Sequence, residues 1–247
     1  MKNYFTHSFL VIIVVFISNV SIYSQFGIRP SIGLSIPASD YSGTLSDYYS
    51  GKAYGLSSGL NLGLAMELGT KVYGFTLVGS MNYSMLKSSG SPSPSSTGNI
   101  DLKQNLFTFT AGPTYYLPLA KDSKIEPYFG INLLYTFISG SVTFTGVKDI
   151  TNGGYDMQTA SRLGIGIKLG TQYNLAQYTF LNIEFNYNFI NAFSKNYGGG
   201  DAGRIGSYQS LNDDKDPSYS PGSSHPIGQS RAISVFLLNM GIEFWLK

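Results

Sequence analysis

The chain has 247 residues, of which 12% are charged and none is Cys, and its 16 Lys and Arg stand against 14 Asp and Glu. The lack of Cys excludes a disulfide framework, a thiolate metal site and a Cys nucleophile, and a net charge of +2 gives no electrostatic basis for binding nucleic acid. With 29 Gly, 19 Tyr and 16 Phe, the composition favours an all-β chain that does not face water over its whole surface.

The first 24 residues have the pattern of a secretory signal peptide. Lys2 supplies a positive start, residues 9–20 are almost wholly apolar, and Ser24 is a small residue at the cleavage position. A membrane-anchoring helix is the alternative, but the apolar stretch is shorter than the ~20 residues that span a bilayer. We therefore expect residues 1–24 to be cleaved and residues 25–247 to form one mature domain.

From residue 26 onward, apolar and polar residues alternate with the period of a β-strand. Leu60, Leu62 and Leu64, for example, alternate with Asn61 and Gly63. The apolar faces of eight such predicted strands cover residues 26–36, 54–68, 73–85, 107–117, 127–137, 163–175, 181–193 and 236–246. None of the apolar-face positions is charged.

The connections between these strands alternate in length. Long ones cover residues 38–53, 86–101, 139–156 and 194–230, and short ones cover 69–71, 118–124 and 176–179. Such alternation is typical of outer-membrane barrels, which have short periplasmic turns and longer outer loops. The sequence therefore predicts an all-β fold, an eight-stranded antiparallel up-and-down transmembrane β-barrel in the outer membrane of a Gram-negative bacterium, with both termini periplasmic.

The polar face indicates which side points inward. It is dominated by Gly, Ser, Thr and Asn, whereas a surface in water carries ~25–35% charged residues. We therefore expect the apolar face to meet lipid; the alternative is a soluble lipocalin-like barrel with its apolar face inside. Aromatic residues near the strand ends are expected to form two interfacial girdles: Tyr54, Tyr73, Tyr83, Tyr115, Tyr135, Tyr173, Phe193 and Phe244.

These features resemble a known family. The stretch Gly112-Pro113-Thr114-Tyr115-Tyr116, followed after a turn by Pro127-Tyr128-Phe129-Gly130, looks like the central hairpin of the small eight-stranded outer-membrane barrels of the OmpA/OmpX type. The resemblance covers almost all of the mature chain and implies fold and location rather than a specific activity. One departure is that the closing strand ends Phe244-Trp245-Leu246-Lys247, whereas the family usually ends on an aromatic residue.

Six charged residues fall on the polar face, which this orientation turns into the lumen: Arg29, Glu67, Glu243, Arg162, Lys168 and Glu184. An eight-stranded barrel is just wide enough for its side chains to fill it, and isolated charges there are costly, so we expect these residues to be paired. In the predicted topology Arg29 lies near Glu67 and Glu243 at the periplasmic end, and Lys168 and Glu184 lie on neighbouring strands. The hypothesis is a salt-bridged plug; the alternative is a charged constriction in a narrow channel.

Candidates for chemistry are few. His225 is the one histidine outside the signal peptide, and it lies among serines in a connection rich in Gly, Ser and Pro, where a solvated His is the simpler interpretation. The acidic run 213–216 could offer oxygen ligands to calcium, but it lacks the spacing of an EF-hand loop, so a solvated acidic turn is the default. We expect no catalytic residue, no metal site and no cofactor.

The leading interpretation is a non-enzymatic integral outer-membrane protein with a mostly closed lumen and a binding, adhesion or envelope-structural role. The alternatives are a small diffusion channel, a lipid-A-modifying enzyme that relies on His225, and an accessory barrel of a secretion machine. Expected partners are outer-membrane lipid and lipopolysaccharide, the barrel-insertion machinery and a surface ligand at residues 194–230. We expect a monomer with no nucleic-acid partner.

Overall fold

The computed structural model describes residues 25–69, 74–92, 98–117, 123–197, 208–215 and 229–246. The predicted signal peptide, residues 1–24, lies outside the described residues, as do Tyr73 and His225. None of the helical segments in the described ranges has the length and hydropathy of a bilayer-spanning helix.

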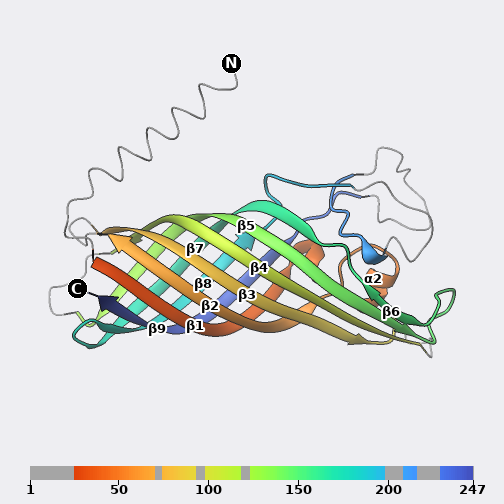
Figure 1. Ribbon diagram of the computed structural model, residues 1–247, viewed down its shortest axis with the longest axis horizontal. Coiled ribbons are helices and arrows are strands. Elements are labelled where there is room, and N and C mark those ends of the chain that lie inside the picture. Colours follow the sequence, from red (N-terminus) through yellow and green to blue (C-terminus); the bar gives the residue numbers. More distant parts are fainter. Residues whose placement is uncertain are drawn as a thin grey trace, which may run out of the picture.

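Nine strands form one antiparallel sheet in the order β4-β3-β2-β1-β9-β8-β7-β5-β6, and a further pairing of β4 with β5 closes it into a cylinder (Figure 1). The strands are β1 (Gln25–Ala38), β2 (Ser57–Gly69), β3 (Phe75–Gly90), β4 (Asn99–Tyr116), β5 (Ile125–Thr145), β6 (Gly153–Asp156), β7 (Ala160–Ala176), β8 (Thr179–Phe189) and β9 (Ser234–Leu246). Eight of them make the barrel wall, and β6 is a short extra strand paired with the end of β5. The predicted eight-stranded antiparallel barrel is thus confirmed.

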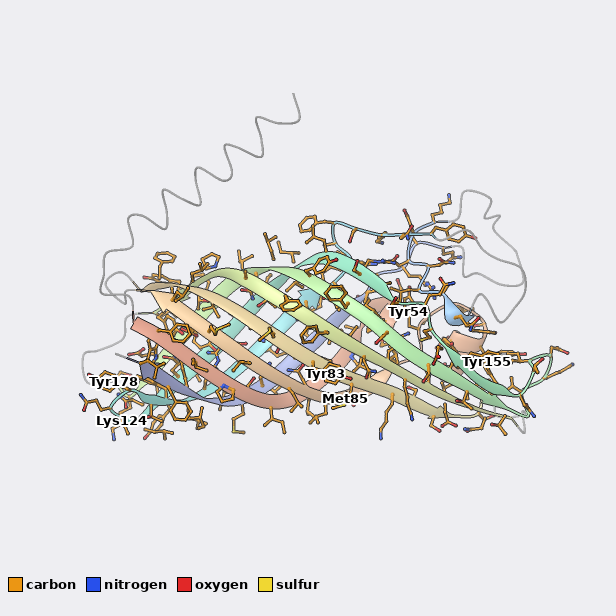
Figure 2. The ribbon with its side chains drawn as sticks, in the orientation of Figure 1. Tyr54, Tyr83, Met85, Lys124, Tyr155 and Tyr178 are labelled. Carbon is orange, nitrogen blue, oxygen red and sulfur yellow. The ribbon has the colours of Figure 1, made fainter. Side chains whose placement is uncertain are left out.

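The two ends of the barrel differ as the connection lengths predict. Residues 70–74, 117–124 and 177–178 link strands at one end, here called the short-turn end. Residues 39–56, 91–98, 146–159 and 190–233 link them at the other, the long-loop end. Figure 2 shows Lys124 and Tyr178 at the short-turn end, and Tyr54 and Tyr155 at the long-loop end.

The outer face of the barrel wall is apolar. On β5, for example, the side chains alternate between 58% exposure at Leu133 and 1% at Leu134. Large apolar side chains lie exposed on each of the eight wall strands, which is the surface that a lipid-embedded barrel needs. The prediction that the apolar face points outward is confirmed by this exposure.

Aromatic rings gather at two levels of this outer face. Near the short-turn end, the ring of Tyr115 lies 4.7 Å from that of Phe75 and 5.6 Å from that of Phe129. Nearer the long-loop end, Phe107, Phe109, Tyr135 and Phe137 make edge-on ring contacts, and Tyr83 lies opposite Phe107. Two such levels are what interfacial girdles require.

Three strands extend further toward the long-loop end than the sequence pattern predicts. β3 runs to Gly90, β4 begins at Asn99 and β5 runs to Thr145, so half of residues 86–101 and most of residues 139–156 are paired strand rather than loop. Together with β6 these extensions form a projecting sheet beyond the barrel wall (Figure 1). In the projecting sheet the polarity of the two faces is reversed, because Ile100 and Leu102 are buried while Lys103 is exposed.

The connection from β1 to β2, residues 39–56, folds into the mouth of the barrel, and we call it the inner strap. It contains the 3-10 turn η1 (Ser39–Tyr41) and the one-turn helix α2 (Leu45–Tyr49). Thr44 caps α2 through a reciprocal pair of hydrogen bonds with Asp47, and these bonds hold the pKa of the Asp47 carboxyl below its ordinary value. The expectation that Tyr54 joins a lipid-facing girdle is wrong: β2 begins only at Ser57, and Tyr54 lies in the inner strap, 2% exposed.

Candidate functional site: a lumen closed at two levels

A charge cluster fills the lumen near the short-turn end. Arg29 on β1 contacts Glu67 on β2 (Nη1–Oε1, 3.2 Å), Glu184 on β8 (Nη2–Oε2, 2.8 Å) and Glu243 on β9 (Nη1–Oε2, 3.5 Å). The side chain of Arg29 is 5% exposed, and those of Glu67 and Glu243 are 1% and 0% exposed. We call these four residues the Arg29 cluster. One guanidinium thus joins strands from both sides of the β1–β9 seam.

Small residues and sheet register create this cluster. Gly27 pairs with Glu67 across β1 and β2, and Ile28 pairs with Phe244 across β1 and β9, so Arg29 lies opposite Glu243. A Cβ at Gly241 would come within 3.2 Å of the Arg29 side chain. Glycine on the inner face therefore leaves the room that the guanidinium needs.

Neutral side chains complete the hydrogen bonding of the carboxylates. Tyr116 donates its hydroxyl to Glu67 at 2.6 Å, Tyr128 donates to Glu184 at 2.9 Å, and Gln172 Nε2 donates to Glu243 at 2.5 Å. Tyr128 also lies against Arg29, whose guanidinium carbon is 6.0 Å from the ring centroid. Such a buried network is stable only when its members are paired, and these contacts supply the partners.

The position of Tyr128 gives a direct test of the network. A Cβ at Gly170 would overlap the Tyr128 ring, so we expect Gly170→Ala to push Tyr128 off Glu184 and to cost about 1–3 kcal/mol of unfolding free energy. Gly79→Ala is the matched control, because a Cβ there meets only one atom, 3.8 Å away. Denaturant titration of the refolded protein in micelles measures both; equal stability of the two variants would contradict the expectation.

Lys168 and Arg162, which were expected in the same network, are placed differently. Lys168 is buried in the lumen beside this network and lines a cavity with Arg29 and Glu184, but within the described residues it has no carboxylate within 4.0 Å. The expected Lys168–Glu184 ion pair is therefore absent from the described contacts, since Glu184 binds Arg29 instead. Arg162 lies at the long-loop end with a partner that the sequence did not indicate.

That partner is Asp213, in the connection between β8 and β9. Arg162 donates to both carboxylate oxygens of Asp213, each at 2.7 Å, and Asn191 Nδ2 and the backbone N–H of Asn196 donate to the same group. Asp213 is 0% exposed. The expectation of a solvated acidic turn is therefore wrong at this position, although Asp214 beside it is exposed. Among the described residues, no group of His, Asp or Glu is arranged to hold a metal ion.

The second closure of the lumen is apolar. The inner strap packs against inward-facing residues of the wall, and the buried cluster includes Tyr41, Leu56, Leu106, Val142 and Phe144. The expectation of a polar lumen is thus wrong for this half of the barrel. A reversed alternation, as in Ile100-Asp101-Leu102-Lys103, is the sequence signal that could have revealed it.

Tyrosine hydroxyls fix the inner strap in place. Tyr48 donates to the carbonyl of residue 208 at 3.2 Å, Tyr54 donates to the carbonyl of Leu211, and Tyr41 donates to Gln104 at 2.5 Å. Burial raises the pKa of all three phenols above the ordinary value, so each remains a neutral donor. Arg231 lies over the Tyr54 ring, 3.9 Å from its centroid, which adds a cation–π contact.

Little space remains between the two closures. Two polar cavities adjoin the Arg29 cluster, both lined by Arg29, Ser80, Asn82 and Glu184. Each cavity leaves only about 10 Å³ for the centre of a water molecule, which is room for about one water molecule. At the long-loop end a larger polar groove of about 320 Å³ is lined by residues that include Ser161, Lys195, Asn196 and Asn212.

Comparisons with known proteins agree with this architecture. The model of the OmpW family matches residues 25–205, whereas none of the curated proteins matches the chain. A major outer membrane protein from Thermus thermophilus has a similar structure, with a TM-score of 0.50 and 13% identity over 90% of this chain and 99% of that one. OprG from Pseudomonas aeruginosa (TM-score 0.48, 14% identity, 90% and 96% covered) and neisserial surface protein A (TM-score 0.48, 14% identity, 89% and 96% covered) are also similar.

Proposed function

Because the chain belongs to the OmpW family and its described strands close into a barrel with an apolar outer face, we propose that this outer-membrane protein has a non-conducting lumen and acts through its long-loop end. The resemblance to OmpA/OmpX-type proteins identified the class of small eight-stranded barrels, and the family model assigns the chain more finely. In the proposed orientation both termini lie in the periplasm and the long-loop end faces the cell exterior.

The double closure of the lumen is the observation that carries this proposal. A solute that entered from the short-turn end would meet the Arg29 cluster, in which every described charged group is tied to neighbours on other strands. A solute that entered from the long-loop end would meet the apolar cluster around the inner strap. This arrangement favours an anchor for surface-exposed segments over a diffusion channel.

The polar groove beside Lys195 supports a binding role at the proposed outer face. Its volume of about 320 Å³ lies at the lower end of the range for small-molecule sites. Its lining comes from the connection between β6 and β7, from the start of β7 and from the connection between β8 and β9. The last of these belongs to residues 194–230, which were expected to carry a surface ligand. No catalytic arrangement in the described residues favours an enzyme.

The test of a closed lumen is conductance in a planar bilayer. We expect the refolded protein to give no discrete current steps, provided that its heat-dependent gel mobility confirms a folded barrel and a porin in the same bilayer conducts. Steps that are reproducible and change in size in Lys168→Ala would contradict the proposal, since Lys168 faces the space between the two closures. In that case the diffusion-channel alternative would be correct.

A further inference from the structure

Two lysines lie directly opposite each other on the outer face of the projecting sheet. Lys87 on β3 and Lys103 on β4 are register partners, and both side chains are exposed. Like charges in this position repel and destabilise a sheet. We call them the lysine pair, and the repulsion between them needs an explanation.

No acid contacts the lysine pair directly in the part of the chain that the structure describes. Among the described residues, neither lysine has a carboxylate within 4.0 Å. Asp101 is the nearest acid along β4, but its side chain accepts hydrogen bonds from Ser89 and from Asn99, the latter at 2.9 Å. The register partner of Lys103 on the other side is Ser141, an uncharged hydrogen-bonding residue. Within the described residues the lysine pair is thus contacted by no carboxylate, although Asp101 lies diagonal to it and the exposed Asp156 follows Ser141 in the same row.

The lysine pair lies just above the lipid-facing surface. On β3, Met85 and Tyr83 follow Lys87 toward the short-turn end, and on β4 Asn105 and Phe107 follow Lys103 (Figure 2 labels Tyr83 and Met85). The lysines thus lie four residues beyond the aromatic girdle, about 13 Å along the strands, or about 10 Å along the membrane normal at a tilt of ~40°. Lysine side chains reach back toward an interface, so their ammonium groups can meet the lipid headgroups.

We infer that the lysine pair binds a phosphate group of a glycolipid in the outer leaflet of the membrane. A phosphate monoester carries up to two negative charges, which matches two adjacent ammonium groups, and its bound form removes the repulsion between them. Ser141 and Asn105 add neutral hydrogen-bonding groups on either side of Lys103. The assignment of the outer leaflet rests on the proposed orientation, because the lysine pair lies on the long-loop side of the girdle.

The experiment uses the full mature chain refolded in zwitterionic nanodiscs that contain a small fraction of diphosphoryl lipid A. Native mass spectrometry measures retained lipid A for the wild type, for Lys87→Gln/Lys103→Gln and for the control Lys52→Gln/Lys148→Gln. Each lysine near a membrane surface changes affinity about fivefold, so the lysine-pair variant is expected to bind about 25-fold more weakly. The control removes two exposed lysines at the same end that lie outside the wall strands, and it is expected to bind like the wild type.

Three results would overturn the inference. They are equal retention by the wild type and the lysine-pair variant, equal retention of lipid A that lacks phosphates, and full displacement of lipid A by inorganic phosphate, which would mark a free-ion site. Orientation is checked separately on intact cells. The chain has no Cys, so Lys148→Cys should react with an impermeant maleimide and Lys124→Cys should not. Failure of that labelling pattern overturns the proposed orientation, whereas failure in nanodiscs overturns the lipid site alone.

Discussion

Replacing Arg29 by Ala is expected to lower the unfolding free energy by about 3–5 kcal/mol, because a buried ion cluster that loses one partner keeps uncompensated charge. Arg29 is the residue that contacts all three of Glu67, Glu184 and Glu243. Its loss leaves three carboxylates facing one another, with side chains that are 1%, 13% and 0% exposed for Glu67, Glu184 and Glu243. Urea titration in micelles, followed by gel mobility of the folded form, measures the effect.

Two further variants separate charge from geometry at this position. Arg29→Lys keeps the positive charge but lacks the planar guanidinium that contacts three carboxylates. Its unfolding free energy should therefore lie between those of the wild type and Arg29→Ala. Adding Glu184→Gln to Arg29→Ala removes one of the facing charges and should recover part of the lost stability. If Arg29→Ala unfolded at the same urea concentration as the exposed control Lys52→Ala, the cluster would contribute nothing to stability.

Asp213→Ala is expected to release the connection between β8 and β9 while the barrel wall stays folded. Asp213 accepts hydrogen bonds from Arg162, Asn191 and the backbone of Asn196, so its loss leaves a buried guanidinium unpaired, at a cost of about 3–5 kcal/mol. That cost exceeds what local opening of a loop requires. Limited proteolysis followed by mass spectrometry should show cuts in residues 194–197 and 208–215 that the wild type resists.

The pair of substitutions Arg162→Leu and Asp213→Leu is the matched control. Apolar replacement of both members of a buried ion pair is often neutral, so the double variant should resist protease better than Asp213→Ala. Asp214→Ala, at the exposed neighbour, should behave like the wild type. Protection of Asp213→Ala equal to that of Asp214→Ala would show that other contacts hold this connection.

The barrel wall was predictable because, wherever the outer face meets lipid, the outward positions are apolar and the inward positions are polar. Leu133 and Leu163 are both exposed, as the pattern predicts. The projecting sheet was missed because its outward positions are polar and its inward positions are apolar. Ile100 and Leu102 point inward onto the inner strap, and Lys103 points outward above the lipid. The backbone continues as strand there, but its outer face meets water instead of lipid. A pattern that requires apolar residues at the outward positions therefore predicts a loop.

The candidate site was also predictable only in part. Arg29, Glu67 and Glu243 lie on strands adjacent across the seam, so topology alone indicated their proximity. Glu184 was assigned to Lys168 on the neighbouring strand, but the Arg29 side chain reaches past β9 to bind it. A comparison of neighbouring strands does not predict that a long side chain can reach a strand two positions away. Asp213 lies in a long connection, where no periodicity fixes the position of a side chain.

The inner strap connects the first two strands, yet two of its three tyrosine hydroxyls bond to the connection between the last two strands. Tyr48 and Tyr54 donate to carbonyls 160 and 157 residues further along the chain, in the middle of the connection between β8 and β9. Tyr41 can meet Gln104 once β4 is in place, but the strap gains its bonds from Tyr48 and Tyr54 only after β8 has been added. If the strands join the wall in chain order, the strap is fully held only after seven of the eight wall strands are in place. In that order, the mouth of the barrel is filled late in assembly, shortly before β9 closes the wall.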